Sequence, residues 1–138
     1  QRGASSAAIA KTPPGITKFA IANPEHAPYG RAAKEALIAM DLWRDAQARL
    51  VLGENIAQAT QFVSTGAAQA GLTALSLAIA PEVAATTRHT IVPVHMHAPL
   101  RQRMVLLKTA RPQARHLFDY LQTEAVRKRL QSMGFGVT

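Results

Sequence analysis

The feature that most constrains this chain is a repeated unit in which a short apolar strand is followed by a turn and an amphipathic helix. In the first copy, the β-branched and aromatic residues of 16–22 predict a strand. Residues 23–30 contain two prolines and a glycine, which predicts a loop. Residues 31–40 carry alanine, leucine and methionine at helical spacing, which predicts a helix.

The second copy begins with a predicted strand at 49–52. After a turn at Gly53-Glu54, Asn55 is a residue type that caps helices, and the apolar stripe that follows stops before Gly66. Alternating strands and helices predict an α/β fold with a mainly parallel sheet flanked by helices.

Further elements are predicted along the rest of the chain, which is 138 residues long and has the length of a single domain. Residues 1–15 are expected to form a leader or loop. A buried strand or strand-to-helix turn is expected at 70–78, strands at 91–94 and 104–107, and helices at 113–121 and 124–133.

Composition and charge limit the possible classes of protein. A hydrophobic content of 48% with 17% charged residues is typical of a folded globular domain, and the absence of cysteine excludes disulfides and thiolate metal sites. The net charge of +8 is concentrated in residues 101–138, which hold eight Lys/Arg and two Asp/Glu. A basic nucleic-acid-binding module is therefore an alternative, although no DNA-binding motif accompanies the charge. We expect no nucleic-acid partner.

Two loops have the chemistry of an anion site. In an open α/β sheet, ligands bind where the strands end and the loops lead into helices. Pro28-Tyr29-Gly30 precedes the first helix and Glu54-Asn55-Ile56 precedes the second, so each exposes backbone N–H groups at the positive end of a helix dipole. The alternative is that these are ordinary turn and cap residues.

Other polar residues point less clearly to chemistry. His95 and His97 would share a face of a strand and could bind a metal, but no third ligand lies nearby in the sequence, and no metal site is predicted. His26, between two prolines, is expected to fix its loop by hydrogen bonding. Arg31 could steer an anion or face solvent, and Trp43 is expected to pack against the end of the first helix.

No catalytic residues are predicted. Ser64, Ser76 and His116 form no nucleophile motif, because the chain has no Gly-x-Ser-x-Gly sequence and no triad partner can be identified. The chain is therefore not expected to be an enzyme or to carry a cofactor.

Several segments, in order, resemble the bacterial periplasmic molybdate-binding proteins. The most specific is Phe19–Ala33 (FAIANPEHAPYGRAA), with its fixed prolines and glycine. Gly53–Ile56 (GENI), Ala70–Ala78 (AGLTALSLA) and His97–Gln102 (HAPLRQ) follow, and the resemblance covers about residues 16–138.

The resemblance implies the second lobe, with the C-terminal helices, of a type II periplasmic binding protein. Such a protein holds a tetrahedral dianion such as molybdate or tungstate between its two lobes by hydrogen bonds alone. Carried onto this sequence, the family's contacts in this lobe are the backbone N–H groups of Tyr29 and Ile56. Some members add a side-chain hydroxyl, but the matching residue here is Ala74, which has none, and the nearby Ser76 could equally be a capping residue.

The resemblance also implies a periplasmic substrate-binding component of an ABC importer, with the membrane permease as partner. It divides the chain into a leader (1–15), an anion-binding lobe (16–100), and a return strand with C-terminal helices (101–138). Since those helices would normally cover a first lobe, their apolar face is expected to be exposed and could form a homodimer. A ligand-sensing regulatory domain of the same fold is the other alternative.

Overall fold

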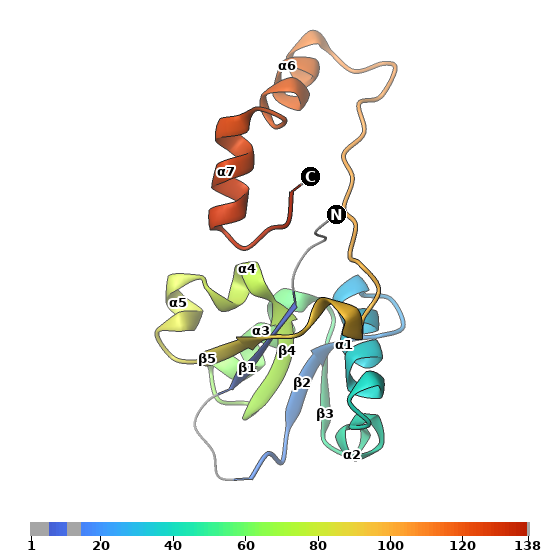
Figure 1. The fold of residues 1–138 in the computed structure, drawn as a ribbon, viewed down its shortest axis with the longest axis vertical. Coiled ribbons are helices and arrows are strands. Elements are labelled where there is room, and N and C mark those ends of the chain that lie inside the picture. The colour runs from blue at the N-terminus through green and yellow to red at the C-terminus, as the bar shows by residue number, and fades with distance from the viewer. Residues whose placement is uncertain (1–5, 11–14, 138) are drawn as a thin grey trace.

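The computed structural model of the chain describes residues 6–10 and 15–137 (Figure 1). The strands of the described part are β1 (Ser6–Ala10), β2 (Phe19–Ala22), β3 (Leu50–Gly53), β4 (Ala70–Ala74) and β5 (Arg88–Ile91). The helices are α1 (Pro28–Ala39), α2 (Trp43–Gln47), α3 (Ile56–Ser64), α4 (Leu75–Ala78), α5 (Pro81–Ala84), α6 (Pro112–Tyr120) and α7 (Glu124–Ser132), with a 3-10 helix η1 (Val94–Met96). None of the helices in this part of the chain is both long enough and apolar enough to cross a membrane.

The strands form one sheet in the order β3-β2-β4-β1-β5. Strand β2 is parallel to both β3 and β4, whereas β1 is antiparallel to its neighbours β4 and β5. The predicted α/β fold with a mainly parallel sheet is confirmed, with β1 as the one reversed strand of this described sheet.

Helices cover both faces of the sheet, and the two central residues of β2 show how. Adjacent residues of a strand point to opposite faces, and both Ala20 and Ile21 are fully buried. Ala20 belongs to a cluster with Val63 and Ala78, on the side of α3 and α4. Ile21 belongs to a cluster with Leu37 on the side of α1 and α2. The lobe is therefore a three-layer structure, and both helix layers follow directly from the predicted strand–turn–helix units.

Trp43 lies where it was expected, partly buried beside the cluster around Leu37. The ammonium group of Lys34 lies 5.2 Å from the centre of its ring, within the range of a cation–π contact.

The prediction that residues 1–15 form a loop is wrong for Ser6–Ala10, which is strand β1 between β4 and β5. Its alanine-rich sequence has weak strand propensity, but pairing on both sides uses its backbone N–H and C=O groups and overrides that preference. The remaining parts of the predicted leader, residues 1–5 and 11–14, lie outside the described residues.

The predicted strand at 104–107 is also wrong, because these residues have no regular secondary structure and belong to no sheet in the described structure. A strand requires a neighbour to pair with, and none of the described strands lies beside this segment. The strand expected at 91–94 ends at Ile91, and the chain then enters η1 after Pro93, which lacks the N–H that a sheet requires.

The C-terminal helices stand apart from the sheet (Figure 1). Neither α6 nor α7 has a buried residue, and the side chain of Leu117 is 57% exposed. After α7 the chain returns to the lobe, where Gly134 lies against Leu75 and Ser76 at the start of α4. The apolar face of α6 is thus exposed, as expected, whereas pairing of two chains through it stays a prediction.

Candidate functional site: two helix starts that share one pocket

The loops that follow β2 and β3 are neighbours because the two strands are parallel and adjacent. Ala22 pairs with Gly53 in the sheet, and the N–H of Asn23 donates to the carbonyl of Gly53 at 2.8 Å. Both loops therefore leave the same edge of the sheet, the edge at which open α/β sheets bind ligands.

Gly30 allows α1 to begin directly over the end of β2. A Cβ atom on Gly30 would lie 2.4 Å from the carbonyl oxygen of Ala22 and 2.6 Å from the carbonyl carbon of Asn23. Any side chain would therefore push the start of the helix away from the strand. The Asn23 side chain also accepts a hydrogen bond from the N–H of Glu25 at 2.9 Å, which holds the turn.

Helix α1 begins without a side-chain cap. Pro28 at its first position has no N–H, and the preceding residue, Ala27, has no side chain that could accept a hydrogen bond. Among the described residues nothing accepts from the N–H groups of Tyr29 and Gly30. The helix was expected to start at Arg31; its earlier start makes the Tyr29 amide part of the first turn, where amides are unpaired.

Helix α3 is capped, but the cap leaves its first amides open. The side chain of Asn55 accepts from the N–H of Gln58 at 2.9 Å, which confirms Asn55 as the N-cap. The Gln58 side chain in turn accepts from the N–H of Glu54 at 2.8 Å. Within the described structure the N–H groups of Ile56 and Ala57 have no acceptor.

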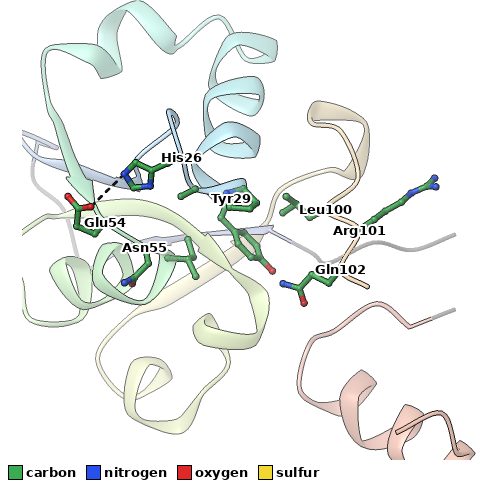
Figure 2. A pocket seen from close by; sticks show the side chains of 10 residues that line it. His26, Tyr29, Glu54, Asn55, Leu100, Arg101 and Gln102 are labelled. Atoms are coloured by element: carbon green, nitrogen blue, oxygen red, sulfur yellow. Dashed lines mark ion pairs between the residues drawn. The ribbon is translucent and has the colours of Figure 1, made fainter. Parts of the chain in front are cut away.

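Both helix starts open into one hollow of about 400 Å³, which we call the helix-start pocket (Figure 2). It is lined by the residues of the two loops and by a segment that follows η1: His26, Ala27, Pro28, Tyr29, Glu54, Asn55, Ile56, Leu100, Arg101 and Gln102. The predicted contact residues Tyr29 and Ile56 are thus brought to the same pocket. Unpaired amides at the positive ends of two helix dipoles suit a small anion.

The side chains of the pocket carry little net charge. Burial raises the pKa of the Tyr29 phenol, so this group stays neutral at physiological pH. His26 Nε2 lies 3.6 Å from Glu54 Oε2, so the imidazole of one loop faces the carboxylate of the other. In Figure 2 the Arg101 side chain points away from the other labelled side chains.

A buried pair of hydroxyls connects α3 to the sheet beneath the pocket. Thr60 and Thr73 are both almost fully buried, and their hydroxyl groups are hydrogen-bonded to each other. Thr60 Oγ1 also donates to the carbonyl of Ile56 at 2.8 Å. The first turn of α3 is therefore tied to β4 as well as to its own cap.

Several residues considered from the sequence lie outside this pocket. Ala74 is buried at the end of β4, and the partly buried Ser76 lies in α4 next to Gly134. Ser64 and His116 also lie outside its lining.

His95 and His97 do not share a strand, because His95 is in η1 and His97 follows it, with its Nδ1 2.9 Å from the carbonyl oxygen of Ala98. Among the described residues, no three His, Asp or Glu side chains are grouped so that they could hold a metal ion.

One wall of the pocket is formed by Leu100, Arg101 and Gln102, and the sequence does not predict that these residues line it. It is held near α1 because the Glu35 side chain accepts a hydrogen bond from the N–H of Ala98 at 2.7 Å. The only sequence signal for this wall was the resemblance of His97–Gln102 to a motif of the periplasmic proteins, because the contact depends on residues far apart in the chain.

Comparison with known proteins shows the family of the chain. The sequence profile of the bacterial extracellular solute-binding proteins matches residues 3–136, nearly the whole chain. The chain belongs to this family. It is 37% identical over 121 residues to the molybdate-binding protein ModA of Azotobacter vinelandii, covering 86% of this chain and 48% of that protein. It is 33% identical over 130 residues to the molybdate-binding protein ModA of Rhodobacter capsulatus, covering 93% and 50%.

The fold is similar to that of the periplasmic molybdate-binding protein of Azotobacter vinelandii, with a TM-score of 0.80 at 23% identity over 99% of this chain and 66% of that one. The resemblance and the fold class expected from the sequence are both confirmed. The chain spans about half the length of the curated relatives it matches. These relatives are binding proteins rather than enzymes by name.

Proposed function

We propose that this chain is part of the substrate-binding component of a periplasmic ABC importer and binds molybdate or tungstate. In this proposal the backbone N–H groups of Tyr29 and Ile56 donate to the oxyanion in the helix-start pocket. The observation that carries it is that two helix starts, whose first amides have no acceptor among the described residues, open into one pocket. The names of the curated relatives, which are molybdate-binding proteins, support molybdate as the ligand.

Selectivity follows from the donors. An N–H group offers a hydrogen and accepts none, so a site built from amides favours an anion that has lost all its protons. Molybdate, tungstate and sulfate meet this condition at neutral pH, whereas hydrogen phosphate presents a hydrogen that needs an acceptor. The membrane permease of the importer is the proposed protein partner. We propose neither a catalytic role nor a cofactor.

The proposal can be tested by equilibrium dialysis of the chain against molybdate, with bound molybdenum measured by mass spectrometry. We expect saturable binding near one anion per chain, displaced by tungstate and only weakly by phosphate. Binding that fails to saturate, or that phosphate displaces as well as tungstate does, would contradict the proposal. Turnover of an ester or phosphoester lost on substituting His26 or Ser76 would contradict the non-catalytic role.

A further inference from the structure

Glu54 is an unexpected residue in a pocket proposed to hold an anion. Among the residues that line the helix-start pocket, it is the one with a carboxylate. A carboxylate there repels an anion and also offers an acceptor to any anion that still carries a proton. Without a positively charged partner, the Glu54 carboxylate would weaken the binding of molybdate and favour the binding of hydrogen phosphate.

The structure places His26 opposite this carboxylate. The two side chains come from different loops, and Nε2 of His26 lies 3.6 Å from Oε2 of Glu54 (Figure 2). The main chain on both sides is fixed independently, by Asn23 in one loop and by Gln58 in the other. Neither turn therefore needs the contact between His26 and Glu54. The contact instead changes the negative charge that Glu54 brings to the pocket.

We infer that His26 is a specificity-determining residue, which engages the Glu54 carboxylate so that the pocket presents N–H donors without a negative acceptor. In its imidazolium form, His26 cancels the charge of Glu54 next to the anion. It also lies beside the carboxylate oxygen that would otherwise accept the hydrogen of hydrogen phosphate. The inference rests on the proposed function and adds to it the means by which a fully deprotonated dianion is preferred.

The size of the effect is set by exposure. The side chains of His26 and Glu54 are 50% and 79% exposed, so water and salt screen their charges. Interactions of exposed pairs correspond to about a twofold to fivefold change in an equilibrium constant. We expect His26→Ala to lower the ratio of molybdate affinity to phosphate affinity by a factor in that range.

A double-mutant cycle separates this role from a structural one. The affinities for molybdate and for inorganic phosphate are measured by calorimetry for the unaltered chain, His26→Ala, Glu54→Gln and the double variant. If His26 acts through Glu54, the double variant regains most of the selectivity that His26→Ala loses, because the uncompensated carboxylate is gone. A purely structural loss would not be rescued by removing a second side chain.

The ion pair of Lys128 with Glu124 on α7 provides a matched control, since it has the same 3.6 Å separation and lies outside the pocket. Lys128→Ala should leave the affinity ratio unchanged. A His26→Ala variant that binds molybdate with an unaltered ratio, or a double variant with no recovery, would overturn the inference alone. If the unaltered chain bound no molybdate, the proposed function would fail and the inference with it.

Discussion

Ile56 offers a way to remove one proposed anion donor without removing a hydrogen bond from the fold. It is the first residue of α3, and among the described residues its N–H has no acceptor. Proline lacks this N–H and is well tolerated at the first position of a helix. The preceding residue, Asn55, has φ −146° and ψ 174°, the extended conformation that a following proline requires. Ile56→Pro should therefore fold.

The expected loss of affinity follows from the bond removed. A hydrogen bond to a charged group contributes about 1.5–3 kcal/mol, so its loss should weaken molybdate binding by roughly 10-fold to 150-fold. The Ile56 side chain is also lost, and Ile56→Ala controls for this, because it keeps the N–H. We expect Ile56→Ala to bind molybdate within a few-fold of the unaltered chain.

Calorimetric titration with molybdate measures both variants, and urea unfolding shows whether they are folded. We expect the two variants to have similar stability, since the restricted backbone of proline offsets part of what the substitution costs. Equal molybdate affinities in Ile56→Pro and Ile56→Ala would refute the assignment of the Ile56 amide as a donor.

Four further outcomes are expected. Gly30→Ala and Gly71→Ala each place a methyl group 2.4 Å from a carbonyl oxygen, so each should lower the free energy of unfolding by about 1–3 kcal/mol. Only Gly30→Ala, which lies beside the pocket, should also weaken molybdate binding. Asn55→Ala should cost about 1 kcal/mol in urea unfolding through loss of the α3 cap. Burial raises the pKa of the Tyr29 phenol in the folded chain. The neutral phenol therefore contributes stability that is present below the ordinary tyrosine pKa and is lost as the pH rises through the folded pKa. Tyr29→Phe should reduce this alkaline loss of stability, measured by thermal melting at a series of pH values. Light scattering should show two chains pairing as the protein concentration rises, because each exposed Leu-sized side chain of α6 that becomes buried contributes about 1.5–3 kcal/mol. Leu117→Lys should reduce this pairing. A chain that stays monomeric at all concentrations would contradict the prediction.

The parts of the fold that could be predicted are those set by neighbouring residues. The Pro and Gly residues of the first loop and Asn55 before α3 are local signals, and they identified the two helix starts that line the pocket. The same local signals predict a start of α1 that is too late, because Pro28 fits a loop as well as the first position of a helix, which is where it lies.

The parts that could not be predicted depend on distant partners. Strand β1 is made mostly of alanine, and it is a strand because β4 and β5 lie on either side of it. Residues 104–107 have stronger strand propensity but no neighbour to pair with in the described structure. The wall at Leu100–Gln102 reaches the pocket through a bond between Glu35 and Ala98, which are 63 residues apart.

The most direct test of the central claim is a titration of the ¹⁵N-labelled chain with molybdate, followed residue by residue through backbone amide resonances. The proposal predicts that the amides of Tyr29 and Ile56 shift most and saturate together. Tungstate should produce the same pattern, and phosphate at the same concentration should move these amides little. Shifts confined to the basic segment 101–138, with the Tyr29 and Ile56 amides unmoved at saturating molybdate, would contradict it.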